Sequence, residues 1–192
     1  MEFLDLIKRN RSYCSFDESV KLSRETVLSF VECARLSASG GNNQPLKYCV
    51  STKESTNALI QRETAWAAKL RPRVFPPEGH KPTAFVVICV DTDIQKDAPK
   101  ADRDVGIAAQ SILLAATAQG FGGLMIGAFN RQGVKEALKL NDNLEPALVI
   151  ALGKPDETVM LEDASGSVDY YRDENDVHHV PKRPMSEIVM EV

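Results

Sequence analysis

The chain has 192 residues, of which 43% are hydrophobic and 26% are charged, as is typical of one globular domain with a sizeable core. Its formal net charge of −4 argues against nucleic-acid partners, and no run of about 20 apolar residues suits a membrane span. We find no secretory signal pattern and expect a cytoplasmic protein. The four cysteines form no CxxC pair and are expected to be free thiols.

The first part of the chain predicts two helices, a loop and a strand. Apolar residues at helical spacing predict a short helix that leads into the basic motif RNRSYCSF, residues 9–16. Ser23 caps a second predicted helix, which stops before the glycine pair of the loop SASGGNNQP, residues 37–45. Residues 46–52 alternate in polarity and predict a strand.

The middle of the chain predicts a helix, an irregular segment and a buried strand. Residues 53–70 predict a helix, and the proline-rich residues 71–82 predict irregular backbone that is a candidate lid. Residues 83–90 form a continuous apolar run, which is typical of a strand at the centre of a sheet. The side chains here that are candidates to meet a substrate are Trp66, Lys69 and Arg71. A helix face and a plain surface loop are the alternative explanation for them.

The next segments predict alternating helices and strands. Residues 103–119 are apolar almost all round and end at a glycine, so they predict a central helix. Residues 122–129 predict a strand with glycines, and residues 131–140 a short helix capped by Asn130. Residues 146–155 predict a further buried strand. The pattern as a whole is mixed α and β.

The composition changes after the last buried strand. Residues 156–176 hold eight carboxylates against the single Arg172, and Lys182 and Arg183 then restore positive charge. The segments VDYYR and VHHVP flank the turn-like DEND, which predicts a hairpin or an extended arm. This part of the chain is expected to be an appendage rather than a second domain.

Two basic clusters are candidates for one anion site. The first contains Lys8, Arg9 and Arg11 with Ser12 near the start of the chain, and the second contains Lys182 and Arg183 near its end. A phosphate accepts hydrogen bonds from arginine in pairs and from a hydroxyl. Two separate solvated patches are the alternative, and the clusters alone do not decide between them.

Two further segments suit a flat ligand. The loop SASGGNNQP offers hydroxyls, backbone N–H groups and carboxamides for a planar heterocycle, although a plain helix-ending loop is the alternative. Glycines in GGLMIGAF allow the backbone to approach a ligand edge, or else form a tight strand exit. The sequence contains no Walker, GxGxxG or GxSxG motif. Adjacent His178 and His179 would point to opposite faces of a strand, which argues against a shared metal.

The order of four blocks resembles that of the nitroreductase family of flavin enzymes. They are RNRSYCSF, SASGGNNQPLKY, DVGIAAQSILLAATAQGFGGLMIGAF, and LGKP followed by HVPKR, and they span essentially the whole chain. The resemblance implies an α+β nitroreductase-like fold with a central mixed β-sheet flanked by helices. It implies one FMN-binding domain over residues 1–192, whose extended C-terminal arm, residues 155–192, is exchanged in a homodimer.

The resemblance also implies the cofactor, the substrates and the site. FMN would take electrons from NADH or NADPH and pass them to a small-molecule acceptor, a nitroaromatic, quinone or similar conjugated compound, in a ping-pong reaction. No side chain is expected to be an obligatory acid or base, because the chemistry is that of the flavin. By resemblance, the residues that bind FMN are Arg9, Arg11, Ser12, Ser39, Gly40, Asn42, Gln44, Gly127, Ala128, Lys182 and Arg183. The loop residues among them would mostly serve the FMN of the other subunit.

The chain departs from the family pattern at a few positions. Cys14 and Asn10 stand where the family usually has basic residues, and Ala38 and Leu46 stand where a proline and an aromatic are common. The missing charge at Cys14 would alter the flavin potential unless another cation substitutes. A flavin-binding dimer without nicotinamide turnover is therefore an alternative function, and a specialised reductase for dehalogenation or flavin cleavage is another.

Overall fold

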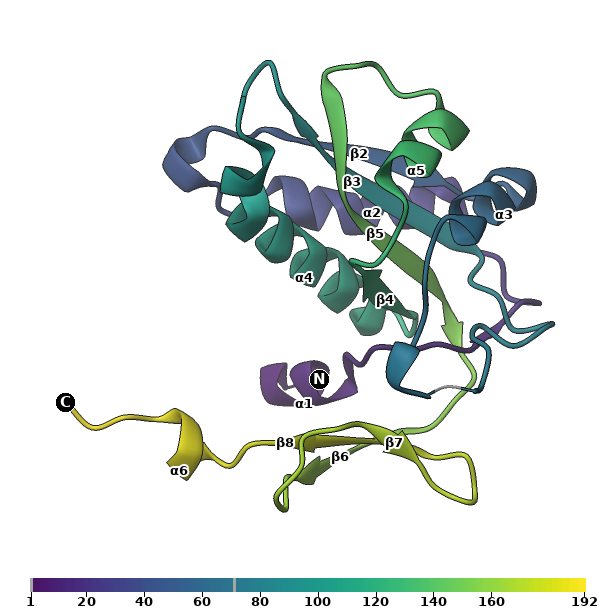
Figure 1. Ribbon diagram of the computed structural model, residues 1–192, viewed down its shortest axis with the longest axis vertical. Helices are drawn as coiled ribbons and strands as arrows, with labels where there is room; N and C mark the ends of the chain where they lie inside the picture. Colours follow the sequence, from purple (N-terminus) through teal and green to yellow (C-terminus); the bar gives the residue numbers. More distant parts are fainter. Residues whose placement is uncertain (1, 71) are drawn as a thin grey trace.

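Two sheets of unequal size organise the computed structural model, which describes residues 2–70 and 72–192 (Figure 1). The helices are α1 (Phe3–Arg9), α2 (Arg24–Arg35), α3 (Glu54–Arg62), α4 (Asp102–Ala118), α5 (Arg131–Leu138) and α6 (Met185–Ile188). The strands are β1 (Phe16–Asp17), β2 (Leu46–Ser51), β3 (Ala84–Asp91), β4 (Gly122–Ile126), β5 (Leu144–Pro155), β6 (Val159–Asp163), β7 (Tyr171–Arg172) and β8 (His178–Lys182). Helical turns also cover Gly40–Asn42, Ala68–Leu70 and Ala98–Ala101.

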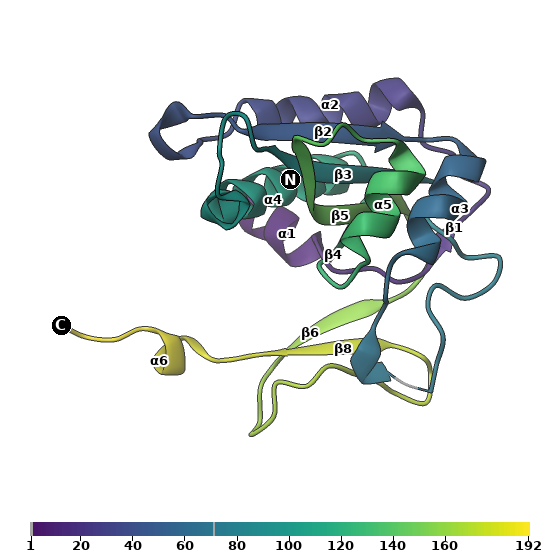
Figure 2. The same cartoon turned by 45° about the horizontal axis from the view of Figure 1, so that its top comes forward.

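Strand β3 lies at the centre of the large sheet, as its sequence predicted. It pairs with β2 on one side and β5 on the other, and all of its residues are buried. Alternate side chains of β3 point to opposite faces, so Val86 and Ile88 pack in the core with α2 and α4. Phe85 and Val87 pack on the other face in a core that includes residues of α3 and α5. Figure 2 shows these helices covering both faces.

The large sheet is antiparallel, whereas we expected a mixed one. Its described strand pairs β1–β5, β2–β3, β3–β5 and β4–β5 all run antiparallel. Within the described residues, parallel pairing occurs at the bridge between Ser12 and Gly123 and in the small sheet. Helices on both faces bury a strand whatever its direction, so the continuous apolar runs did not distinguish the two cases.

The helix caps follow the predictions. The Ser23 hydroxyl accepts a hydrogen bond from the Thr26 amide at 3.1 Å, and Asn130 Oδ1 accepts one from the Gly133 amide at 3.1 Å. Helix α3 is shorter than the predicted helix over residues 53–70 and ends at Arg62. The chain leaves the helix because the Ala65 amide donates to the Ala128 carbonyl at 2.8 Å, next to the end of β4.

The small sheet is the C-terminal arm. Strands β7 and β8 form the predicted antiparallel hairpin, and β6 adds a parallel pairing to β8 that was not predicted. In Figures 1 and 2 this sheet lies apart from the large one, and the chain beyond β8 projects away from the molecule. No helix among the described residues has the length and apolar character needed to cross a membrane.

Candidate functional site

A pocket of about 360 Å³ lies between the end of β4, the N-terminal motif and the arm; we call it the central pocket. Its walls are mostly apolar, with a few polar side chains. The residues that line it are Ser12, Cys14, Ala65, Trp66, Ala67, Leu124, Met125, Ile126, Gly127, Ala128, Tyr170, His178 and Val180. A small organic ligand commonly occupies a pocket of about this size and character.

Two glycines of β4 hold the N-terminal motif beside the pocket. The Tyr13 amide donates to the Gly123 carbonyl at 3.1 Å. A Cβ at Gly123 would lie 2.3 Å from the Ala151 carbonyl oxygen, and one at Gly122 would lie 2.6 Å from the Tyr13 ring. Both glycines are therefore needed for the chain's own close packing. They bring the start of the chain to the strand that ends in the pocket.

The central pocket unites three of the residues assigned to FMN. Ser12 comes from the N-terminal motif, and Gly127 and Ala128 follow β4 directly. Gly127 differs from the two glycines of the strand, because a Cβ built on it meets no heavy atom within 4 Å. The packing of the chain does not require a glycine there, which leaves room for a ligand edge.

The two basic clusters have separate partners in the single chain. Arg11 donates from Nη2 to the Ile7 carbonyl at 2.8 Å, and its buried Nε has no partner. Burial lowers the pKa of Arg11 from its usual value. Arg183 pairs with Glu187 at 2.9 Å, and Lys182 is exposed. Arg9 lines a different cleft of about 160 Å³. Within the single chain, each cluster is thus held by its own neighbours.

The loop residues Ser39, Gly40, Asn42 and Gln44 lie together but at another place. The Ser39 hydroxyl and the Gly40 amide both donate to the Asp104 carboxylate, at 2.6 and 3.0 Å. The Gln44 amide donates to the Ser39 hydroxyl at 2.9 Å, and its side chain donates to Asn42 Oδ1 at 3.2 Å. Asn42 and Gln44 have positive φ angles of 55° and 49°. The loop is thus held in one shape by α4.

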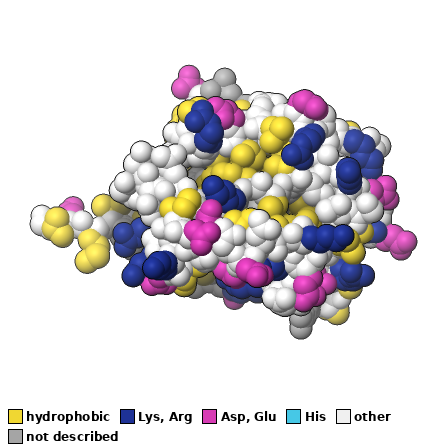
Figure 3. All heavy atoms as spheres, turned by 90° about the horizontal axis from the view of Figure 1, so that it is seen from above, with side chains coloured by type: hydrophobic (Ala, Val, Ile, Leu, Met, Phe, Trp, Pro, Cys, Tyr) yellow, Lys and Arg dark blue, Asp and Glu magenta, His cyan; other side chains and the backbone are white. Residues whose placement is uncertain are grey.

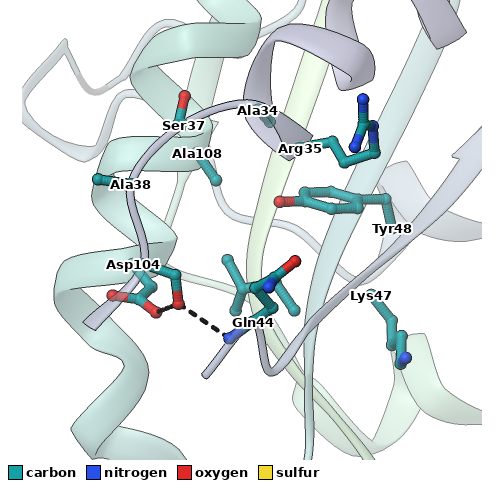
Figure 4. A pocket seen from close by; sticks show the side chains of 11 residues that line it. Ala34, Arg35, Ser37, Ala38, Gln44, Lys47, Tyr48, Asp104 and Ala108 are labelled. Carbon is teal, nitrogen blue, oxygen red and sulfur yellow. Dashed lines mark hydrogen bonds between the residues drawn. The ribbon is translucent and has the colours of Figure 1, made fainter. Parts of the chain in front are cut away.

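A second pocket, of about 230 Å³, lies under this loop. Figure 4 shows Tyr48 approaching it from β2, and Asp104 and Ala108 from α4. Burial raises the pKa of the Tyr48 phenol, and the Asp104 charge adds to this effect. None of the central-pocket residues lines this second pocket. The loop therefore does not line the central pocket of its own chain, and the two pockets have no lining residue in common.

Cys14 is buried in the wall of the central pocket and lies against an ion pair. Its amide and that of Ser15 both donate to Glu157, which pairs with Arg172. The side chains of Glu157 and Arg172 are each 4% exposed, and the Arg172 guanidinium lies over the Phe75 ring, 4.9 Å from its centre. Burial, with the Glu157 charge, raises the pKa of Cys14 to about 12. The thiol is neutral, and Arg172 is compensated by Glu157.

The three side chains that were candidates to meet a substrate have different positions. Trp66 lines the central pocket and donates from Nε1 to the Thr64 hydroxyl at 2.8 Å. Lys69 is exposed and pairs with Asp169 of the arm. Arg71 lies outside the described residues. In the candidate lid itself, Arg73 pairs with Asp176, so this segment too is joined to the arm.

Sequence reasoning missed the contribution of the arm to the pocket. Tyr170, His178 and Val180 line it, and His178 and Val180 share a face of β8 because they are two residues apart. His179 points to the other face, where its ring stacks on Tyr171 at 4.7 Å between centres. The prediction that the two histidines face opposite sides is confirmed. The same alternation was the signal that could have placed His178 beside a ligand.

The site fits FMN in two respects. The unpartnered Nε of Arg11 suits an anionic group, and the open space at Gly127 suits a flat ring that approaches the backbone. No cluster of three or more His, Cys, Asp or Glu suited to a metal occurs in the described part of the chain. The fold and the pocket define an α+β protein with an apolar site for a flat organic ligand.

Comparisons with known proteins agree with this class. The model of the Nitroreductase family matches residues 7–154, and the chain belongs to that family. An Archaeoglobus fulgidus protein provisionally named NADH dehydrogenase/NAD(P)H nitroreductase is 25% identical over 159 residues, which cover 80% of this chain and 86% of that protein.

Solved structures show the same fold. A nitroreductase family protein from Streptococcus pneumoniae has a TM-score of 0.72 at 21% identity, and the match covers 100% of both chains. The NADPH:FMN oxidoreductase of Vibrio harveyi, solved with NAD+, has a TM-score of 0.69 at 22% identity, covering 98% of this chain and 76% of that chain. The α+β nitroreductase-like fold expected from the sequence is thereby confirmed.

Proposed function

We propose that the chain is an FMN-dependent oxidoreductase that takes electrons from NADH or NADPH and passes them to a conjugated acceptor such as a nitroaromatic or a quinone. The two substrates would use the site in turn, by a ping-pong mechanism. The observation that carries the proposal is the central pocket, where Ser12 meets Gly127 and Ala128. These residues are far apart in the sequence, and its resemblance to the nitroreductase family assigns them to one ligand.

The residues of the chain would bind and orient the flavin, which supplies the hydride and electron transfer when bound. The Ser12 hydroxyl and the backbone at Gly127 and Ala128 offer hydrogen bonds to a polar ring edge. Leu124 and Ile126 give the pocket apolar walls that exclude water from the ring. Arg11 would hold the phosphate, with Lys182 and Arg183 completing the charge.

We further propose that the protein is a homodimer. The projecting tail carries hydrophobic side chains with no cover, and Figure 3 shows them along the projection seen from above Figure 1. The ligand loop with Ser39 and Gln44 lies away from the central pocket of its own chain. A second copy would supply both a surface for the tail and a loop for the pocket.

Anaerobic reduction tests the function directly. Protein reconstituted with FMN is expected to lose the colour of oxidised flavin on addition of NADH or NADPH and to regain it with a nitroaromatic or quinone. R11A combined with K182A should be nearly colourless, while K100A, which removes an exposed cation near Asp97, should keep its flavin. Failure of the wild-type protein to bind FMN would overturn the proposal.

The neutral surroundings of Cys14 favour a second candidate, a flavin-binding dimer without nicotinamide turnover. Arg172, the arginine beside Cys14, is compensated by Glu157, so among the described residues it offers Cys14's wall of the pocket no uncompensated charge that would stabilise an anionic reduced flavin. The same anaerobic experiment separates the two functions. Flavin that binds and stays oxidised with both nicotinamides would support the second candidate.

A further inference from the structure

His178 is a buried imidazole in the wall of the central pocket with no hydrogen-bond partner. His178 is 4% exposed, and neither its Nδ1 nor its Nε2 has a hydrogen-bond partner within the described residues. Buried polar groups in folded proteins nearly always have partners, and an unpaired one is costly. A buried histidine without partners at a ligand pocket therefore needs an explanation.

The position of His178 is fixed by the sheet of the arm. Strand β8 is the middle strand, and His178 lies opposite Val159 of β6 and Arg172 of β7. Its amide donates to the Thr158 carbonyl at 2.9 Å, and its ring packs edge-on against Tyr170 with centres 5.4 Å apart. The backbone is thus held from both sides, and the ring has a defined place in the pocket wall.

His178 is neutral at ordinary pH. Burial is the main cause that lowers its pKa to about 4, and the nearby charges of Arg172 and His179 act in the same direction, while Asp176 opposes them weakly. A neutral imidazole carries one N–H donor and one nitrogen acceptor. A half-turn about the Cβ–Cγ bond exchanges ring nitrogens with ring carbons, so the ring can present a nitrogen to the pocket without moving the backbone.

We propose that His178 is a ligand-binding residue of the central pocket, where its neutral imidazole forms a hydrogen bond to the polar edge of the flavin ring system. This inference rests on the proposed function. Cys14 lines the same pocket and offers only a weak S–H donor in place of the usual cation. His178 supplies the stronger neutral donor and acceptor at this wall, so it contributes to recognition of the ring rather than of the phosphate.

Titration with FMN tests the inference through binding alone. H178F keeps a ring beside Tyr170 and removes both nitrogens, and is expected to raise the Kd for FMN about tenfold, the loss of roughly one hydrogen bond. H178Q keeps a donor and an acceptor and should stay within about threefold of the wild-type protein. H179F is the matched control, because its ring can still stack on Tyr171 on the other face of β8; its Kd should not change. Circular dichroism of each variant confirms folding.

A measurement on the wild-type protein covers the case in which H178F does not fold. The ring nitrogens of the three histidines in 15N-labelled protein are assigned with H178Q, H179F and H80Q, and FMN is then added to saturation. We expect the His178 signals to shift and to keep the pattern of a neutral ring, with His179 unchanged. FMN binding that leaves both the Kd of H178F and the His178 signals unaltered would overturn this inference alone. Absence of FMN binding by the wild-type protein would overturn the proposed function, and this inference with it.

Discussion

At the scale of single residues, the buried pair of Glu157 and Arg172 sets the charge behind the pocket. Glu157 accepts from Arg172 and from the amides of Cys14 and Ser15, so one carboxylate links the arm to the N-terminal motif. Burial raises the pKa of Glu157, although these hydrogen bonds act against the rise. Such a pair is costly to break, because removing one partner leaves the other charge buried.

We expect E157Q to lower the free energy of unfolding by about 3 kcal/mol, because Arg172 then remains buried without a compensating charge. Urea unfolding at neutral pH measures the change. E162Q is the matched control, since Glu162 is 34% exposed and pairs with the more accessible His179; its loss should be under about 1 kcal/mol. Equal losses in the two variants would show that burial of the Glu157 pair does not decide its contribution.

The pH dependence of stability should contain a contribution from His178. Its pKa is about 4 in the folded chain and about 6.5 when unfolded, so the unfolded chain binds more protons at this residue between those values. The wild-type protein therefore loses up to about 3 kcal/mol from this residue as the pH falls from 6.5 to 4.

H178F lacks this contribution, and its unfolding free energy should fall less steeply over the same range. Urea unfolding of both proteins at three pH values across the range gives the difference, in which the other titrating groups largely cancel. Parallel curves for the wild-type protein and H178F would contradict a neutral buried imidazole at His178.

At the scale of elements, local signals predicted most of the architecture. Ser23, Asn130 and Gly120 mark helix ends in both the sequence and the structure, and the apolar run at residues 83–90 became the central strand. Strand direction and the early end of α3 at Arg62 were not predictable, because both depend on pairing with distant segments. The parallel pairing of β6 with β8 was missed for the same reason.

The glycines of β4 and of its exit should separate stability from binding. G123A is expected to lower the unfolding free energy by about 3 kcal/mol, because its Cβ would lie 2.3 Å from the Ala151 carbonyl oxygen and 2.8 Å from Leu113. G127A meets no heavy atom within 4 Å and should change stability by under about 0.5 kcal/mol. Its methyl group would enter the central pocket and weaken FMN binding.

Thermal unfolding and FMN titration of the two variants check this contrast. The expected pattern is a lower Tm for G123A, and an unchanged Tm with a raised Kd for FMN in G127A. A strong loss of stability in G127A would mean that the chain itself needs that glycine. An unchanged Kd would place the ligand away from the end of β4.

At the scale of the whole molecule, the residues expected to bind FMN lie at more than one place in the single chain. The central pocket gathers Ser12, Gly127 and Ala128, whereas the loop with Ser39 lines another pocket and Lys182 is exposed at the end of β8. The resemblance to the family implied both that these residues form one site and that the loop residues mostly serve the FMN of the other subunit. Contacts between separate copies leave no periodicity or spacing in a sequence, so the expectation of a shared site comes from the resemblance and not from composition or periodicity.

The C-terminal tail provides the test of assembly at this scale. The tail, residues 185–192, includes α6, and no side chain of this helix is buried within the chain. Met185 and Met190 are 68% and 84% exposed. Apolar side chains this exposed gain from cover by a second copy.

A chain that ends at Pro184 keeps Lys182, Arg183 and the whole small sheet, so it should fold with a nearly unchanged Tm. Its dimer should dissociate at least tenfold more readily, as measured by sedimentation velocity over a range of concentrations. M185S/M190S keeps the length of the tail and should weaken the dimer in the same direction. A truncated chain that dimerises as tightly as the full chain would show that the tail does not join the two subunits.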